Sequence, residues 1–379
     1  MSRRKIKNNI SYDDKRKKYY VTFFYGKDSS GKNIKKAQTF NKLREAENAL
    51  KKFEGDKVDH KIVMPTKDTV KSYSEYWLNN EKRDLKETTK NNYKRMLDLH
   101  IIPYMGNVEL QKVTRPFINK FFTYLEKEKG FGSRYVREHY DLLKSIFKTA
   151  IEDEKIYKNP LASIKPIKVP EREATVYTVK QLQKLFKLSE GKSLEIVVKL
   201  GGYLGLRRGE ICGLKWQAVD MVKRSIDIVN SRTQAGKKLI EDGVKSSSSV
   251  RRLDIPDGLF NVLKRIKTKQ EDDKKALGKM YHDDGYVVCK TDGTPYKPTY
   301  LSDAFSKLLL KNHMPHIRLQ DLRHTFATIA IANASIYDVS KELGHSEIRT
   351  TDKIYVKQTD RKNTRAINAV AAQIDNNSN

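Results

Sequence analysis

Two polar stretches that contain proline divide this chain of 379 residues into separate folding units. Residues 55–67 lack hydrophobic periodicity, which predicts a linker. Residues 159–174 carry three prolines at a spacing that no helix tolerates, so a stiff interdomain connection is expected there. Three domains follow, each within the usual size range. The predicted domains are residues 1–60, 66–165 and 171–379, the last with a helical tail.

The middle domain has an almost entirely helical pattern. Between residues 69 and 164, apolar residues recur at helical spacing in four runs, the second of which should close before Pro103. Aromatic residues at such spacing are expected in a hydrophobic core rather than on a base-stacking surface. The pattern therefore predicts a bundle of about four helices.

The sequence of the first domain predicts a small three-stranded sheet backed by one helix. Residues 19–25 are rich in aromatic and β-branched side chains, and residues 32–40 alternate in character, as strands do. Residues 43–53 show helical spacing instead. With the helical bundle and a third domain of mixed pattern, the expected fold is multidomain, mainly α with small β-sheets.

The chain is strongly basic, with 76 Lys and Arg against 47 Asp and Glu and a formal net charge of +29. Such an excess favours a polyanionic partner, because neutralising nucleic-acid phosphates releases counterions. Apolar side chains make up 38% of the sequence, enough for packed cores. The two cysteines lack a metal-ligand spacing, and no segment resembles a membrane span or signal peptide. We expect a cytoplasmic protein that binds DNA.

Basic side chains on the first two domains are candidate DNA contacts. On the predicted strands and their flanks, residues on the face opposite the core can enter a major groove, and a solubilising surface is the alternative. These residues are Lys17, Lys18, Lys35, Lys36 and Gln38. On the helical domain, Lys86, Lys90, Lys94, Arg95 and Arg134 can grip a DNA backbone, although each alone is also consistent with a solvated charge.

Two distant segments carry the residues that suggest chemistry. Residues 205–216 place Arg207 just before a short predicted helix, where a guanidinium can be held against a phosphate. Residues 320–355 place Arg323, His345 and Tyr355 on consecutive short helices. An anion-binding group, a hydrogen-bonding group and a possible nucleophile together indicate phosphate chemistry.

Both segments resemble the motifs of one family. Residues 205–216 read Gly-Leu-Arg-Arg-Gly-Glu-Ile-Cys-Gly-Leu-Lys-Trp, similar to the first arginine motif of the tyrosine recombinase (phage integrase) family. Residues 321–325 read Asp-Leu-Arg-His-Thr, and Leu-Gly-His-Ser and Thr-Thr-Asp-Lys-Ile-Tyr follow, similar to its second. Two motifs in the right order are a specific signal. The three-domain layout also resembles integrases of phages and integrative conjugative elements, with an arm-type DNA-binding domain, a helical core-binding domain and a mixed α+β catalytic domain.

The resemblance implies a divided active site. Arg207 and Arg323 would clamp the non-bridging oxygens of the scissile phosphate, and Tyr355 would attack its phosphorus. His345 would hydrogen-bond the phosphate or the nucleophile. Glu210 is better explained as an orienting partner than as a catalytic acid.

The family also places a lysine on a β-hairpin, to protonate the departing 5′ oxygen. Lys245 is the best match here, lying between predicted strands at 225–229 and 251–255. Lys237 and Lys238 are rivals on register grounds.

One position departs from the family pattern. Most members have a histidine three residues before the second arginine, where this chain has Gln320. A glutamine can donate a hydrogen bond to a phosphate oxygen but cannot accept the tyrosine proton as histidine does. His316 would substitute only if the backbone register shifted, which the apolar pattern of the following helix opposes.

The resemblance further implies the partners. These are double-stranded DNA at core and arm-type attachment sites, three further copies in a homotetramer, and an accessory DNA-bending or excisionase protein. No cofactor and no metal are expected, since the phosphotyrosyl link stores the bond energy. Two alternatives stay open: a type IB topoisomerase that relaxes DNA as a monomer, and a DNA-binding protein that has lost catalysis.

Overall fold

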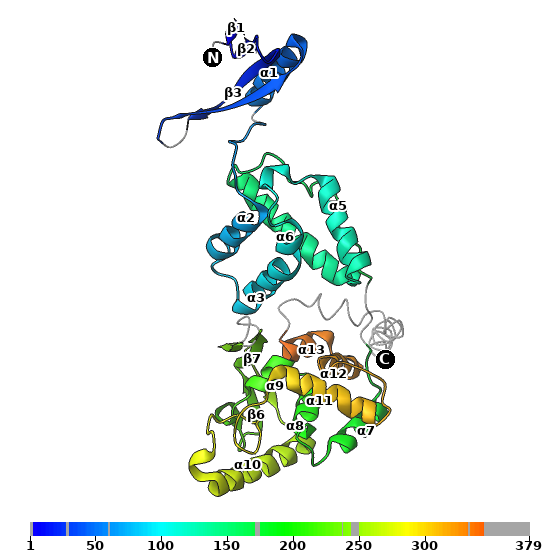
Figure 1. The fold of residues 1–379 in the computed structure, drawn as a ribbon. Coiled ribbons are helices and arrows are strands. Elements are labelled where there is room, and N and C mark those ends of the chain that lie inside the picture. Colours follow the sequence, from blue (N-terminus) through cyan, green and yellow to red (C-terminus); the bar gives the residue numbers. More distant parts are fainter. Residues whose placement is uncertain are drawn as a thin grey trace, which may run out of the picture. The chain divides into compact units, whose positions relative to one another are not determined.

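The computed structural model of the chain describes residues 3–27, 30–59, 61–170, 175–236, 238–243, 250–332 and 334–344 (Figure 1). The chain divides into two compact units, residues 1–171 and 172–379. The first unit contains two hydrophobic cores, one in an N-terminal sheet and one among helices. Within the described ranges, no helix combines the length and the apolar character needed to cross a membrane.

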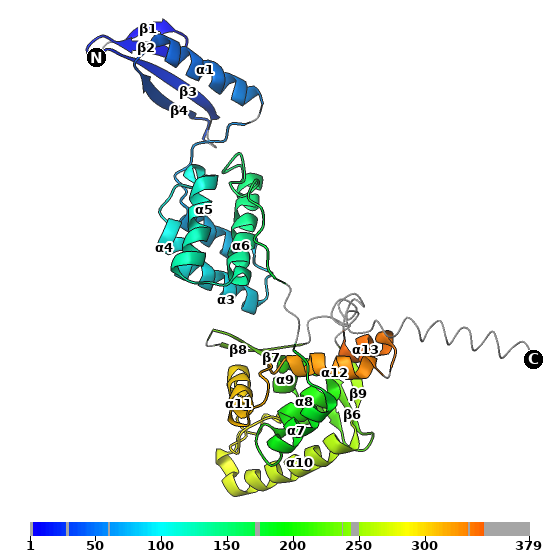
Figure 2. The same cartoon turned by 90° about the vertical axis from the view of Figure 1, so that its right-hand side faces the viewer.

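The N-terminal sheet is antiparallel and carries one helix on one face (Figure 2). Its strands follow the chain order: β1 (Arg4–Lys7), β2 (Ile10–Asp13), β3 (Lys18–Lys27) and β4 (Asn33–Phe40). Helix α1 (Leu43–Val58) packs on β3, where the Phe23 and Phe53 ring centroids are 4.8 Å apart. The described sheet has four strands rather than the expected three. Strands β1 and β2 are only four residues each and lack a β-branched run, so their sequences carry little strand signal. Helix α1 also continues past residue 55, where the linker was expected to begin.

The strand register corrects the expectation that all the candidate DNA contacts of this domain face away from the core. Directly opposed residues in an antiparallel pair share a face. Lys36 lies opposite Phe23 and Gln38 opposite Val21, so both lie on the face that α1 partly covers. Lys35, opposite Phe24, lies on the other face with Lys18. Neighbouring lysines cannot share a face, because side chains alternate along a strand. Lys17 precedes β3 with a φ of 51°.

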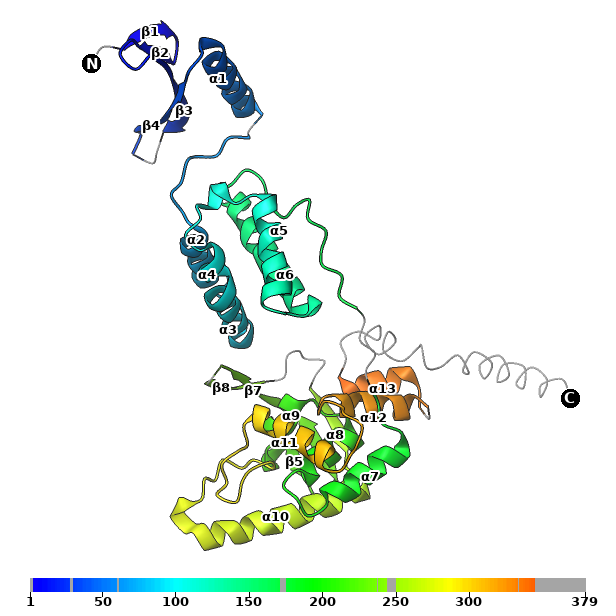
Figure 3. The same cartoon turned by 45° about the vertical axis from the view of Figure 1, so that its right-hand side comes forward.

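The helical part of the first unit contains the four predicted helical runs (Figure 3). They are α2 (Val70–Tyr76) with the π-helical turn η1 (Trp77–Glu81); α3 (Glu87–Met96) with η2 (Leu97–Ile101) and α4 (Ile102–Met105); α5 (Arg115–Thr123) with η4 (Tyr124–Glu128); and α6 (Ser133–Glu152). The second run does not close before Pro103 but continues through it. Proline is tolerated there because it lies in the first turn of the α4 segment.

The aromatic residues of this bundle form its core, as predicted. Trp77 is fully buried and its Nε1 donates to Thr149 Oγ1 at 3.2 Å. The Tyr73 hydroxyl donates to Asp153 Oδ2 at 2.7 Å. Trp77 and Tyr73 are 0% and 3% exposed, so their ring faces are not available for stacking on bases.

A buried histidine gives this bundle a predictable pH dependence. His139 is 0% exposed, its Nδ1 bonds the Tyr135 carbonyl at 2.8 Å, and its Nε2 has no partner. Burial lowers the pKa of His139 to about 4. An unfolded histidine titrates near 6.5, so the unfolded state binds more protons between these values and stability falls as pH decreases through that window.

We therefore expect the bundle to be about 2 kcal/mol less stable at pH 5.0 than at pH 7.5 through His139 alone. The chain has two tryptophans, so Trp77 fluorescence in a Trp216→Phe background reports urea unfolding of this bundle. In His139→Phe this part of the pH dependence should disappear. An identical shift of the urea midpoint in the two proteins would contradict the assignment.

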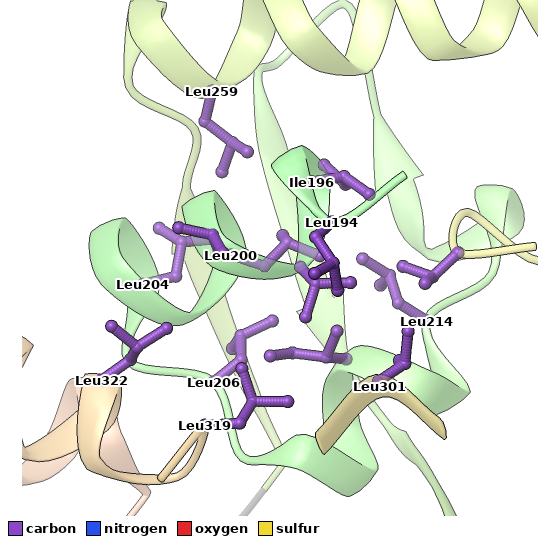
Figure 4. Packing of buried hydrophobic residues seen from close by; sticks show 14 of the residues in the cluster. Leu194, Ile196, Leu200, Leu204, Leu206, Leu214, Leu259, Leu301, Leu319 and Leu322 are labelled. Atoms are coloured by element: carbon purple, nitrogen blue, oxygen red, sulfur yellow. The ribbon is translucent and has the colours of Figure 1, made fainter. Parts of the chain in front are cut away.

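The second unit is built around helix α8 (Glu195–Leu204), which contacts α7 (Val179–Ser189), α10 (Asp257–Leu277) and α12 (Asp321–Ile331). Figure 4 shows leucines of α8, α10 and α12 converging on one core, with Leu200 and Leu204 of α8 between Leu259 and Leu322. A capping box begins α7: Thr178 Oγ1 accepts from the Gln181 backbone N–H. Among its described residues the unit also contains helices α9 (Arg208–Gly213), α11 (Pro298–Lys311) and α13 (Ile336–Leu343), the short strand β5 (Val219–Asp220) and four further strands.

Its sheets differ in one respect from the expectation. Strands β6 (Ser225–Ile228) and β9 (Arg251–Asp254) pair antiparallel, as predicted. Between them the chain forms a further hairpin of β7 (Asn230–Ala235) and β8 (Lys238–Gly243). Strand β7 consists largely of polar residues, so its sequence lacks the apolar alternation that predicts a strand. Lys245 therefore follows β8 instead of lying in a β6–β9 turn. Its segment, residues 244–249, is outside the described residues.

Candidate active site

Arg207 lies at the corner between α8 and α9, and Gly205 makes that corner possible. Gly205 ends α8 with a φ of +60°. A Cβ there would lie 2.6 Å from Phe326 Cδ1 and 2.8 Å from Leu343 Cδ2. A larger residue would suffer both the left-handed backbone and these contacts. Glycine thus lets α12 and α13 approach the corner that presents Arg207.

The Arg207 side chain is held by two partners and stays partly accessible. Its Nη1 donates to Glu210 Oε1 at 2.7 Å, and its Nη2 donates to the Gly344 carbonyl at 3.2 Å. The Arg207 backbone N–H donates to Glu210 Oε2 at 2.9 Å. The guanidinium is thus oriented by its partners, and 35% of the Arg207 side chain stays exposed.

Arg323 approaches the same place from α12. Its Nη1 donates to the Gly205 carbonyl at 2.9 Å and its Nη2 to the Leu343 carbonyl at 2.6 Å. Arg323 is 3% exposed. Close packing of α12 on α8 sets this position, since a Cβ on Gly201 would lie 3.1 Å from Leu322 Cδ1. The fold therefore brings the two predicted arginines together on adjacent carbonyls at the end of α13.

Glu210 is a buried carboxylate held in its ionised form. Burial would raise the pKa of Glu210, but hydrogen bonds and charge from Arg251 and Arg207 outweigh it and hold the pKa below its usual range. Its side chain is 3% exposed. A group that stays ionised and bridges two guanidiniums orients them and does not act as a proton donor.

Gln320 lies at the N-cap of α12, beside the arginine corner. Its Oε1 accepts a hydrogen bond from the Arg208 backbone N–H at 3.2 Å. This contact uses the amide oxygen and orients the amide NH2 as a donor. His316, on the preceding loop, is exposed.

Three predicted residues, Lys245, His345 and Tyr355, lie outside the described residues. Helix α13 ends at Leu343 with Gly344 in the left-handed conformation as its C-cap, so His345 is the next residue along the chain. The rival Lys238 lies at the β7–β8 turn, paired with Ala235.

Arg251 is a residue of this corner that the sequence-based prediction missed. Its side chain is 6% exposed and its Nη2 donates to Glu210 Oε2 at 3.0 Å. The alternation of side chains along β9 could have indicated its burial. Arg251 lies two residues before the buried Leu253 and therefore on the same face of the strand.

The helical-domain candidates for DNA contact lie on two helices. Lys86 is the N-cap of α3, and Lys90 and Lys94 follow at four-residue spacing on one face. Lys86, Lys94 and Arg95 are exposed, and Lys90 is half-buried. Arg134 on α6 is exposed, with its Nε 3.8 Å from Glu138 Oε1. In the described ranges, no group of three His, Cys, Asp or Glu side chains could hold a metal ion.

Two family models match the chain. The model for the phage integrase family matches residues 175–362, and the model for the phage integrase N-terminal SAM-like domain matches residues 69–125. Together they cover more than half of the chain and include both arginine segments. The chain belongs to the phage integrase family. The family prediction made from the two motifs is thereby confirmed.

Relatives of this integrase extend the similarity to nearly its whole length. It is 27% identical to a tyrosine recombinase XerC-like protein of Caldanaerobacter subterraneus subsp. tengcongensis, over 96% of each chain. It is also 27% identical to the ICEBs1 integrase of Bacillus subtilis, over 72% of this chain and 74% of that protein. The expectation of a tyrosine recombinase that exchanges DNA strands is confirmed at the level of the family.

Solved structures show the same fold. The Tn1549 transposon integrase in complex with a circular intermediate DNA matches 80% of this integrase and 99% of that chain, with a TM-score of 0.66 and 22% identity. A lambda integrase tetramer bound to a Holliday junction matches 93% of this chain and 96% of its own, with a TM-score of 0.57 and 17% identity. The expected fold class is confirmed.

Proposed function

We propose that this integrase cuts and rejoins DNA at specific sites through a 3′-phosphotyrosyl intermediate, and so integrates or excises a mobile element. The observation that carries the proposal is the convergence of Arg207 and Arg323 on adjacent carbonyls of α13, directly before His345. Two fixed guanidiniums in one corner suit a single phosphate. The match to integrases of an integrative conjugative element and a transposon supports the mobile-element substrate.

The chemistry follows from the charges that must move. The Tyr355 oxygen attacks the scissile phosphorus, and its proton passes to water because Gln320 cannot accept it. A bond forms to the 3′ phosphate, and the bond to the 5′ oxygen breaks. Lys245 gives a proton to that departing oxygen. Arg207 and Arg323 neutralise the charge that develops on the non-bridging oxygens, and His345 donates a further hydrogen bond. The phosphotyrosyl bond keeps the energy of the phosphodiester, so resealing by a 5′ hydroxyl needs neither ATP nor metal.

Gln320 acts in this scheme as a donor to the phosphate, oriented by the Arg208 backbone N–H. Because an amide does not titrate, this position should contribute no pH dependence to cleavage. Gln320→His installs a group that titrates near pH 6.5 and can accept the tyrosine proton when neutral. The ratio of variant to wild-type cleavage rates should therefore rise severalfold between about pH 5.5 and 8. A ratio that is flat across this range would contradict the role.

The three domains divide the binding of DNA between them in this proposal. Residues 1–60 bind arm-type sites through the sheet face that carries Lys18 and Lys35, with Lys17 at its edge. Lys36 and Gln38 contribute from the β4 edge. Residues 66–165 hold the core site through the basic face of α3, and residues 171–379 perform catalysis. Support comes from the two family models and from the lambda integrase match, which includes the N-terminal region.

Assembly and location belong to the same proposal. Four protomers bring two sites together and exchange strands through a Holliday junction, with an accessory DNA-bending or excisionase protein setting direction. The supporting structure is the lambda integrase tetramer on a junction. The protein works in the cytoplasm, on the nucleoid.

Joining of two DNA molecules tests this function against the topoisomerase alternative. A supercoiled plasmid and a labelled linear duplex, each carrying the DNA that lies beside this gene, are incubated with the protein. The proposal predicts a labelled recombinant with sequence-defined junctions. Relaxation of the plasmid without any joined product would favour a type IB topoisomerase, and binding without either product would favour a protein that has lost catalysis.

A further inference from the structure

Three arginines converge on the last turn of α13. Arg251 Nε donates to the Glu342 carbonyl at 2.5 Å, Arg323 Nη2 to the Leu343 carbonyl at 2.6 Å, and Arg207 Nη2 to the Gly344 carbonyl at 3.2 Å. The three acceptors are consecutive residues. Each guanidinium comes from a different part of the unit: strand β9, helix α12 and the α8–α9 corner.

The backbone carbonyls at the end of α13 explain why arginines bind there. The last carbonyls of a helix lack intrahelical donors, and the partial negative charge there favours cations. The Gly344 backbone N–H donates to the carbonyls of Ser340 and Lys341. The next three carbonyls are those that accept from the arginines. The end of α13 is thus fixed by side chains from outside the helix.

Arg251 differs from the other two because it also binds the carboxylate that orients Arg207. Its Nη1 lies 3.2 Å from Glu210 Oε1 and its Nη2 3.0 Å from Glu210 Oε2. Glu210 Oε1 accepts from Arg207 as well. One planar guanidinium therefore links α9 to α13, a task that a lysine point charge cannot perform because it lacks the fork.

We propose that Arg251 is a positioning residue of the active site. It acts through Glu210 on Arg207, and through the Glu342 carbonyl on the end of α13, from which the chain proceeds to His345. Arg251 itself touches no substrate. The inference rests on the proposed function, because only a reaction at a phosphate makes the orientation of Arg207 matter.

Arg251→Lys is the primary test, because it keeps a positive charge beside the buried Glu210. Cleavage is followed as covalent capture of nicked duplexes made from the DNA beside the gene. We expect single-turnover capture to slow by about 30- to 100-fold, the usual cost of losing an outer positioning contact, with the DNA dissociation constant within about twofold of wild type. Arg252→Lys is the matched control: it is the next residue, exposed, and paired with Asp227 at 2.8 Å. It should cleave within about twofold of wild type.

A neutral scissile phosphate separates positioning from mere stabilisation of the fold. A methylphosphonate at the cleaved position carries one negative charge less, so exact placement of Arg207 matters less there. The deficit of Arg251→Lys relative to wild type should shrink at least about tenfold on this DNA, as should that of Arg207→Lys. Equal deficits on both substrates would show a structural role only and overturn the proposal.

Failure of the inference and failure of the proposed function look different. If wild type captures no duplex, the proposed function fails. If wild type captures DNA and folded Arg251→Lys captures it equally fast, the inference alone fails. Should Arg251→Lys not fold, Arg251→Gln decides, since Arg207 still pairs with the buried Glu210 and the amide can still donate to it. Slow capture by folded Arg251→Gln supports the proposal, and wild-type capture overturns it.

Discussion

Replacing Arg323 with lysine is expected to slow covalent capture of DNA by about 1,000-fold, the cost of removing one fixed donor from a developing oxyanion. Arg323 donates through two nitrogens to the Gly205 and Leu343 carbonyls, which fixes the plane of its guanidinium. A lysine keeps the charge but not the fork, so it cannot hold both carbonyls and face a phosphate oxygen. Binding of duplex DNA should change little, because many phosphate contacts share that task. The measurement is single-turnover capture on nicked duplexes beside equilibrium binding.

Arg318→Lys provides the control for this variant. Arg318 lies on the same segment, with 51% of its side chain exposed, and its Nη2 donates to Asp321 Oδ1 at 2.7 Å. The Arg318 side chain hydrogen-bonds Asp321 instead of the carbonyls at the end of α13. Its replacement should leave capture within about threefold of wild type. If Arg323→Lys captured DNA as fast as Arg318→Lys, Arg323 would be a packing residue and the two-arginine clamp would be wrong.

Replacing Tyr355 with phenylalanine is expected to abolish capture while leaving DNA binding intact. The change removes one oxygen, the atom that would form the bond to phosphorus. After cleavage of a nicked duplex, the short fragment that carries the free 5′ hydroxyl dissociates and resealing stops. The covalent complex therefore accumulates, and it survives denaturing electrophoresis. Wild type should show this complex and Tyr355→Phe none.

Tyr337→Phe is the matched control for the nucleophile. Tyr337 lies on α13 and is 61% exposed, so its hydroxyl is accessible but belongs to no motif. This variant should form the complex at the wild-type rate. Capture that persisted in Tyr355→Phe and disappeared in Tyr337→Phe would relocate the nucleophile.

Much of the fold was predictable because each helix of the middle domain buries a continuous stripe. Trp77 and Phe147 lie at helical spacing with their apolar neighbours and are fully buried, so periodicity alone located their helices. The capping box at Thr178 and Gln181, which begins α7, is a local signal of the same kind. These signals are local, and local signals are readable from one sequence.

Features that depend on tertiary packing and on strand register were not predictable. Strand β7 (Asn230–Ala235) is polar and packs on α9, where a Cβ on Gly213 would lie 2.9 Å from the Arg232 backbone nitrogen. Its strand character comes from that tertiary contact and not from propensity. The faces of Lys36 and Gln38 likewise depend on the register of β4 against β3.

The residues of the candidate site were easier to identify than their arrangement. The two motifs pointed to Arg207 and Arg323, and the fold brings them together. No pattern in the sequence indicates that both would bind the end of α13, or that Arg251 would join them there. Such contacts join segments far apart in the chain, and only the packing of α12 and α13 on the α8–α9 corner creates them.

In the proposed mechanism Tyr355 carries the DNA during strand exchange. Trypsin should release Tyr355 on a peptide of residues 354–357, because Lys353 and Lys357 flank it. After capture on a nicked duplex and digestion of both DNA and protein, mass spectrometry should find this peptide with a nucleotide joined through a 3′ phosphate. Recovery of the same peptide unmodified, with the nucleotide on any other residue or with no covalent adduct at all, would contradict the claim.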